Sequence, residues 1–224
     1  MQNIFDIYQP NQQLAHKICF FKRNLDIQPF FLLLRLDNNV YKNYQIRENL
    51  KRALRNLTDQ GLLNVEVQWS DNENWIDFMA DIKSNFPDIN LGSATIINKK
   101  SIDDSIKIGL NYSMMRTWKK ELYLYSKQKN HLLIPGLKTL KELEEAIKLN
   151  SKVIKIFPVK DKKYNLNINN HKDISFIAAG NLSLIDLRRY KTEGYDGIVI
   201  GQKGYDGKVF NPIILKWLQQ NNDR

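Results

Sequence analysis

The sequence has few of the residues that metal and thiol chemistry require. Among 224 residues there is one cysteine, Cys19, which permits neither an internal disulfide nor a thiolate zinc site. The three histidines, His16, His131 and His171, lie far apart and show no ligand-like spacing. We therefore expect no metal, no cofactor and no Ser-His-Asp mechanism.

Long hydrophobic runs are also missing. The longest apolar run, Phe30–Leu34, has five residues, whereas a membrane-spanning helix needs about 18. The first residues lack the basic-then-apolar pattern of a secretory signal. We expect a soluble, cytoplasmic protein that does not bind a membrane.

Ten glycines are present, but neither the Gly-x-Gly-x-x-Gly pattern nor the Walker A pattern occurs. The usual nucleotide-binding versions of an open α/β sheet therefore lose support. Charge is unbalanced, with 34 Lys and Arg against 24 Asp and Glu and a net charge of +10. This excess indicates either an anionic partner or a composition biased toward Lys, Asn and Ile, and composition favours the second explanation.

Apolar residues make up 42% and aromatic residues 11% of the chain, enough for one sizeable core. Short β-branched or apolar runs alternate with segments of helical periodicity. Eight strands are predicted, at residues 30–36, 62–69, 90–96, 110–115, 131–134, 153–157, 174–178 and 197–200. Alternating strands and helices with short connections favour an α/β fold, a small (β/α)8 TIM barrel.

The chain begins with an extra segment. Residues 11–23 place Leu14, Ile18 and Phe21 on one helical face, which predicts an amphipathic N-terminal helix. We expect an N-terminal helical extension over 1–28 and the barrel over 29–224. Residues 160–170 predict a surface loop where the alternation would place another helix.

Charged residues occur where a barrel interior normally takes apolar side chains. Lys155 has two apolar residues on each side, and Glu66 shares its strand face with two amides. Arg35 follows the first strand, while Ser93 and Thr95 share one side of the third. We expect Arg35, Glu66, Thr95 and Lys155 to point into one cavity.

Burial of an unpaired ion costs several kcal/mol. Lys155 and Glu66 are therefore either paired in a buried bridge without catalysis or kept for chemistry, and the residue pattern leaves both open. The chemistry that suits them is Schiff-base formation with a ketone. Burial and a nearby guanidinium both lower the pKa of a lysine, which leaves its amine unprotonated and nucleophilic. Glu66 would then transfer protons, while Arg35 and Thr95 would bind a carboxylate or phosphate.

At these residues the chain resembles the 2-keto-3-deoxy-6-phosphogluconate (KDPG) aldolases and the related 4-hydroxy-2-oxoglutarate aldolases. The resemblance runs from about residue 29 to 204. Lys155-Ile156-Phe157-Pro158 looks like the family's Lys-Phe-Phe-Pro around the Schiff-base lysine. Residues 134–139, Ile-Pro-Gly-Leu-Lys-Thr, resemble the family's Ile-Pro-Gly-x-x-Thr.

The resemblance implies roles for further residues. It makes Lys155 the Schiff-base residue and Glu66 the general acid/base, and it places Thr95 on the keto-acid carboxylate. The remaining substrate-binding positions that it implies are Arg35, Pro135, Gly136, Gly180, Asn181, Gly201 and Gln202.

The sequence departs from the family at several binding positions. The arginine expected two residues after Gln68 is Ser70, and the family's Ser-Pro-Gly after strand four is Met115-Arg116-Thr117. Arg116 is a candidate to restore the missing positive charge, and Lys203 is a candidate phosphate ligand. For both, a solvated or structurally paired cation is the alternative.

The resemblance implies a class I lyase that cleaves KDPG to pyruvate and glyceraldehyde 3-phosphate through a lysine Schiff base. KDPG belongs to the Entner–Doudoroff pathway of carbohydrate metabolism. One alternative is a pyruvate-forming lyase for an unphosphorylated acid, either a 4-hydroxy-2-oxoglutarate aldolase or an oxaloacetate decarboxylase. Another is a non-catalytic basic barrel that binds nucleic acid or protein. The implied partner is a small 2-keto acid, not nucleic acid, and the implied assembly is a homotrimer.

Overall fold

A computed structural model describes residues 12–159 and 168–221 of the chain. Residues 1–11 of the expected N-terminal extension and most of the expected loop at 160–170 fall outside these ranges. Within them, strands and helices alternate as the sequence predicts, except that the strand expected at 131–134 is followed, without a helix, by a second short strand at 136–137.

The strands are β1 (Phe30–Leu34), β2 (Asn64–Gln68), β3 (Asn90–Ile96), β4 (Tyr112–Met115), β5 (Leu133–Ile134), β6 (Gly136–Leu137), β7 (Val153–Ile156), β8 (Ser175–Leu182) and β9 (Gly197–Ile200). The α-helices are α1 (Gln12–Ile27), α2 (Asn38–Lys42), α3 (Tyr44–Thr58), α4 (Trp75–Asn85), α5 (Lys99–Ile108), α6 (Lys120–Gln128), α7 (Leu140–Lys148), α8 (Leu187–Thr192) and α9 (Pro212–Asn221). Two 3-10 turns, η3 (Ile168–Asn170) and η4 (Leu184–Asp186), complete the described elements.

The described strands are all parallel and follow the order β5-β4-β3-β2-β1-β9-β8-β7-β6. The two ends of this order, β5 and β6, are separated in the chain by Pro135 alone, so the sheet curls into a nearly closed barrel. Proline cannot donate to a ladder and therefore interrupts the strand. Its carbonyl still accepts a hydrogen bond from the Lys155 backbone at 2.9 Å. The prediction of a TIM barrel is confirmed.

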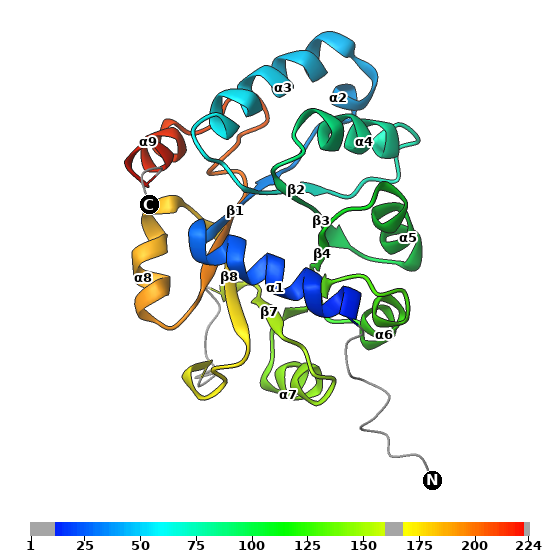
Figure 1. Cartoon of the computed structure of the whole chain (residues 1–224), viewed down its shortest axis with the longest axis vertical. Helices are drawn as coiled ribbons and strands as arrows, with labels where there is room; N and C mark the ends of the chain where they lie inside the picture. Colours follow the sequence, from blue (N-terminus) through cyan, green and yellow to red (C-terminus); the bar gives the residue numbers. More distant parts are fainter. Residues whose placement is uncertain (1–11, 160–167, 222–224) are drawn as a thin grey trace.

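Alternation along each strand divides the core into two layers. Helices surround the strands on the outside of the barrel (Figure 1). One set of side chains, including Val65, Val67, Ile154 and Ile156, packs between the strands and these helices. The other set fills the barrel interior and includes Phe31, Tyr112 and Val153. Val153 lies on the same face of β7 as Lys155.

Helix α1 closes one end of the barrel, across which it lies in Figure 1. Its buried Leu14, Phe21 and Leu25 join the interior cluster. The Phe21 ring stacks on Phe31 with centroids 5.1 Å apart and meets Tyr112 edge-on at 4.9 Å. Because these contacts involve the first halves of the strands, α1 covers the end opposite to the carboxyl ends of the strands.

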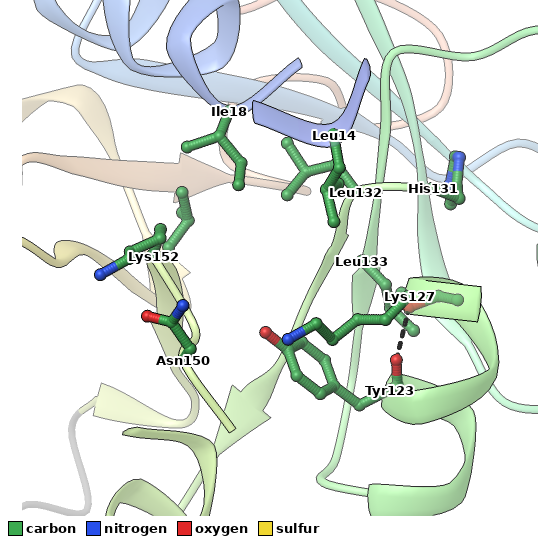
Figure 2. Close-up of a pocket in the computed structure, with 11 residues that line it drawn as sticks. Leu14, Ile18, Tyr123, Lys127, His131, Leu132, Leu133, Asn150 and Lys152 are labelled. Carbon is green, nitrogen blue, oxygen red and sulfur yellow. Dashed lines mark hydrogen bonds between the residues drawn. The ribbon is translucent and has the colours of Figure 1, made fainter. Parts of the chain in front are cut away.

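A small cavity lies beneath α1 at this same end (Figure 2). Its volume is about 20 Å³, room for roughly one water molecule. Leu14 and Ile18 of α1 form one side, and the side chains of Tyr123 and Lys127 point into it from α6. A cavity of this size cannot hold a metabolite.

Within the described residues, no helix has both the length and the apolar character needed to cross a lipid bilayer.

Candidate active site

The large cavity opens at the carboxyl ends of the strands and has a volume of about 610 Å³. In α/β barrels this end carries the binding and catalytic residues, because the loops that follow the strands meet there. Its lining residues are Leu33, Arg35, Glu66, Gln68, Ala94, Thr95, Arg116, Lys155, Phe157, Pro158, Ala179, Gly180, Asn181, Val199, Gly201 and Gln202. The four residues predicted to share a cavity therefore do so.

Glu66 enters the cavity from the middle of β2. Val65 and Val67 on either side pack against the helical layer, so alternation turns Glu66 to the interior. Only 1% of Glu66 is exposed, and neither carboxylate oxygen has a hydrogen-bond partner among the described residues. Burial raises the pKa of Glu66 to about 7, against the opposing effects of the positive Lys155 and Arg35.

Lys155 enters from β7 in the same way, because Ile154 and Ile156 face the helices. It is 7% exposed. Burial lowers the pKa of Lys155 to about 8. The nearby Glu66 carboxylate raises this pKa, and the Arg35 and Arg116 guanidiniums lower it. A fraction of the amine is therefore unprotonated at neutral pH, as the sequence predicts.

The sequence left open whether Lys155 and Glu66 form a structural bridge. A buried bridge is stable only when hydrogen bonds satisfy both charges. In the described part of the chain neither a hydrogen bond nor an ion pair joins the two side chains, and both oxygens of Glu66 are unsatisfied. This geometry favours the alternative in which the two groups are kept for chemistry.

Gly92 and Tyr112 lie next to Glu66 in the barrel interior, although neither lines the cavity itself. Gly92 pairs in register with both Glu66 and Tyr112. A Cβ at Gly92 would overlap the Tyr112 ring, so glycine is needed for the ring to lie inside the barrel. The Tyr112 hydroxyl donates to the Val65 carbonyl at 3.3 Å. The ring thus shields the lower side of Glu66 from water, and burial raises the pKa of Tyr112 well above its usual value.

Thr95 reaches the cavity through an irregularity that corrects one expectation. The β3–β4 register shifts between Ala94 and Ile96, and Thr95 has φ 63°. Ser93 and Thr95 were expected on one side, but Ser93 hydrogen-bonds Ser105 of α5 at 2.7 Å and so faces the helices. The bulge turns Thr95 to the opposite side, into the cavity. A β-branched residue at positive φ is strained, and such strain is common at functional sites.

Two arginines stand at the rim. Arg35 follows β1, and one of its guanidinium nitrogens lies against Gly201, where an added Cβ would be 2.9 Å away. Arg116 follows β4, with its guanidinium 6.0 Å from the Phe157 ring centroid. Both side chains are exposed and line the cavity.

The remaining predicted residues fall into two groups. Gly180, Asn181, Gly201 and Gln202 line the cavity. Pro135, Gly136 and Lys203 do not. The first two are buried: Pro135 accepts the Lys155 backbone hydrogen bond, and Gly136 packs against the Arg116 carbonyl. Lys203 is exposed, and its carbonyl accepts a hydrogen bond from the Asn211 side chain.

Several cavity residues were not named as candidates, and for two of them, Gln68 and Phe157, the sequence position alone indicated the interior face. Gln68 lies two residues after Glu66, and Phe157 two residues after Lys155. Alternation alone places both on the interior face of their strands. Across residues 12–159 and 168–221, no group of three His, Cys, Asp or Glu side chains is arranged to hold a metal ion.

The fold and the cavity define a TIM-barrel protein whose large cavity opens at the carboxyl ends of the strands. A family model described as KDPG and KHG aldolase matches residues 42–206. The chain belongs to this aldolase family.

Solved structures share the fold at low sequence identity. The native KDPGal structure is 18% identical, with TM-score 0.71 over 87% of this chain and 93% of that one. The 2-keto-3-deoxy-6-phosphogluconate aldolase from Zymomonas mobilis is 16% identical, with TM-score 0.70 over 88% and 93%. A KDPG aldolase from Legionella pneumophila, with pyruvate captured as a covalent carbinolamine, is 15% identical, with TM-score 0.67 over 89% and 96%. No curated protein sequence matches the chain.

Proposed function

We propose that the chain is a class I aldolase that forms a Schiff base between Lys155 and a 2-keto acid, with Glu66 as the proton-transfer group. The observation that carries the proposal is the buried amine of Lys155 in a cavity that also holds the buried Glu66 carboxyl group, whose oxygens have no hydrogen-bond partner among the described residues. Membership of the aldolase family supports it. So does the captured carbinolamine of the Legionella pneumophila protein.

The proposed reaction uses one lysine and one proton carrier. The unprotonated Nζ of Lys155 attacks the C2 carbonyl carbon to form a carbinolamine, and protonated Glu66 gives its proton to the carbinolamine hydroxyl, which leaves as water. An iminium ion and the Glu66 carboxylate remain. Glu66 accepts the proton of the C4 hydroxyl while the C3–C4 bond breaks, and the bonding electrons move toward the iminium to form an enamine. The aldehyde leaves, and Glu66 gives its proton to C3 of the enamine, which restores the iminium. Water then hydrolyses the iminium to pyruvate and the free Lys155 amine, and the released proton returns to Glu66.

Cavity charge supports a substrate with two anionic groups. The charged residues among its lining are Arg35, Arg116, Lys155 and Glu66. Lys155 and Glu66 add up to about zero net charge while they share one proton, whichever group holds it. The two arginines then leave a net charge of about +2, which matches a 2-keto acid that carries a second anion.

KDPG, with a carboxylate and a phosphate, is the favoured substrate, and its cleavage yields pyruvate and glyceraldehyde 3-phosphate. An unphosphorylated dicarboxylate such as 4-hydroxy-2-oxoglutarate or oxaloacetate is the second candidate. The exposed position of Lys203 away from the cavity favours this second candidate, since it removes one expected phosphate ligand. The homotrimer implied by the resemblance stays a prediction, which light scattering would test.

The test is pyruvate release from KDPG, 4-hydroxy-2-oxoglutarate and oxaloacetate, measured by coupled oxidation of NADH. The wild-type chain is expected to turn over at least one of them, and Lys155→Met is expected to reduce the rate to background. Exposed Lys141, on α7, provides a matched control: Lys141→Met should keep full activity. Equal rates for the wild type and Lys155→Met on all three acids would contradict the proposal. Salt-sensitive binding to polyanions would then favour the non-catalytic alternative.

A further inference from the structure

The two cavity arginines have no acidic partner in the described part of the chain. Among the described residues, no hydrogen bond or ion pair joins either Arg35 or Arg116 to a carboxylate, and the oxygens of Glu66 are unpaired. An unpaired guanidinium at the rim of a cavity is suited to bind an anionic ligand, because its planar fork fits a carboxylate or phosphate. The question is which anionic group of the substrate each arginine takes.

Arg116 stands on the Lys155 side of the cavity. Its backbone carbonyl lies 2.7 Å from the position of a Cβ at Gly136, and Gly136 pairs in register with Lys155. Its guanidinium lies over the ring of Phe157, which follows Lys155 by two residues and also lines the cavity. The Arg116 side chain therefore contacts the segment that carries Lys155, and its backbone packs against β6, which pairs with the lysine strand.

Thr95 and Arg116 both line the cavity from the carboxyl ends of adjacent strands, β3 and β4. Ile96 pairs in register with Met115, so the residue before Ile96 and the residue after Met115 belong to the same region of two adjacent strands. The bulge directs the strained Thr95 into the cavity there. Arg35 enters elsewhere: β2 and β3 separate its strand from β4, and it contacts Gly201 after β9.

In a 2-keto acid the carboxylate is bonded directly to the carbonyl carbon that reacts with lysine, so its ligand must lie close to that lysine. On the basis of the function proposed above, we infer that Arg116, assisted by Thr95, binds the carboxylate next to the reacting carbonyl. Arg35 is then left for the second anionic group, on the side of the loops that follow β8 and β9. Arg116 thus selects 2-keto acids over neutral ketones.

The test separates carboxylate binding from lysine reactivity. The imine is trapped with borohydride at increasing pyruvate concentration in the wild type, Arg116→Met, Arg116→Lys and Arg35→Met. Trapping is measured at a pH about one unit above the Lys155 pKa, so that the influence of Arg116 on that pKa has little effect. Because Arg116 is exposed at the rim of the cavity, its contact with the carboxylate should be of moderate strength. Arg116→Met should therefore raise the half-saturating pyruvate concentration about tenfold. Arg116→Lys should fall between Arg116→Met and the wild type.

A neutral ketone and a surface variant provide the controls. Hydroxyacetone has no carboxylate, so Arg116→Met should trap it as well as the wild type does. Lys120→Met removes a positive charge from an exposed position outside the cavity and should change neither ligand. The inference is overturned if Arg116→Met binds pyruvate as well as the wild type does, or if its trapping of hydroxyacetone falls as much as its trapping of pyruvate. It is also overturned if Arg35→Met weakens pyruvate binding more than Arg116→Met does. Failure of the wild type to trap pyruvate would instead refute the proposed function.

Discussion

Lys155 and Glu66 are exceptions to the rule that buried charges are paired and hydrogen-bonded. Burial lowers the pKa of the lysine to about 8 and raises that of the carboxyl group to about 7. The two values approach each other, so that near neutral pH either group can hold or release the shared proton. This is the property that a nucleophilic amine and a proton carrier both need.

Glu66→Gln tests the electrostatic coupling between the two groups. The Glu66 carboxylate raises the pKa of Lys155, so its removal should lower that pKa further. The rise of the imine-trapping rate with pH should therefore move to lower pH in the variant. Turnover should fall about 10²- to 10⁴-fold because the proton carrier is lost.

The control for this variant is Glu73→Gln, which removes an exposed carboxylate from the loop that follows β2. It should leave both the pH profile and the turnover unchanged. A Glu66→Gln profile that stays in place or moves to higher pH would contradict the coupling.

Lys155→Met tests how much the buried amine lowers the free energy of unfolding. The lysine has a lower pKa in the folded chain than its ordinary value of 10.5. Between about pH 8 and 10.5 the unfolded chain therefore binds more protons than the folded chain. The loss of stability caused by the buried amine is complete below pH 8 and disappears as the pH rises to 10.5. The variant should gain about 1–3 kcal/mol in free energy of unfolding at pH 7.

Urea denaturation at pH 7 and pH 10.5 measures this gain. Lys141→Met, at its exposed position, should stay within about 0.5 kcal/mol of the wild type at both values. A Lys155→Met variant that is less stable than the wild type at pH 7 would show that the buried amine does not destabilise the folded chain.

At the scale of the elements, the sequence predicts strands well where both neighbours of an inward residue are β-branched or apolar. β7 shows this clearly, because Ile154 and Ile156 can pack only against the helices and leave Lys155 inside. β3 shows the limit. Strict alternation assigns Ser93 and Thr95 to one side, but a bulge at positive φ places Thr95 opposite. The sequence around Thr95 does not predict this bulge, because a residue at positive φ is usually glycine or asparagine.

Other differences between the predicted and the observed elements also arise from short segments or tertiary contacts. α2 is a short helix that begins at an Asp37 cap, and five residues are too few to show periodicity. Predicted helix 11–23 extends to Ile27 because Leu25 and the Asn24 carbonyl make contacts with the barrel that only the tertiary structure supplies. The cavity residues were predictable from strand faces. The absence of a hydrogen bond between Lys155 and Glu66 was not, because it depends on how the side chains extend.

The packing of β3 against β4 provides a prediction at this scale. Gly92→Ala places a methyl group against the Tyr112 ring and should cost about 1–3 kcal/mol of stability. The same substitution combined with Tyr112→Leu should cost much less than the sum of the two single changes. Thermal unfolding of the four proteins measures the coupling. Additive costs would show that the ring can move aside.

The whole molecule is a barrel with one end closed and one open. α1 closes the amino-terminal end through Phe21, which stacks on Phe31 and meets Tyr112 edge-on. The Asn64 amide donates to the Asn24 and Gln28 carbonyls at 3.1 and 2.8 Å. The large cavity opens at the other end. Closure of one end keeps Lys155 and Glu66 in surroundings of low polarity, on which their pKa shifts depend.

Adjacent phenylalanines in α1 test this closure with a matched pair. Phe21 is 1% exposed in the barrel end, whereas Phe20 is 39% exposed on the same helix. Phe21→Ala should cost about 3–5 kcal/mol because it leaves a cavity in a packed aromatic cluster. Phe20→Ala should cost less than about 1 kcal/mol. Equal losses in urea denaturation would mean that α1 does not seal the barrel.

Borohydride reduction in the presence of pyruvate, followed by peptide mass analysis, tests the central claim most directly. Reduction converts an iminium into a stable secondary amine, so the reacting lysine carries the mass of one reduced pyruvate. We predict this mass on the peptide containing Lys155 and its absence when pyruvate is omitted or when Lys155 is replaced by methionine. An unmodified Lys155 under conditions that trap pyruvate on another member of the family would contradict the account, as would the label on a different lysine.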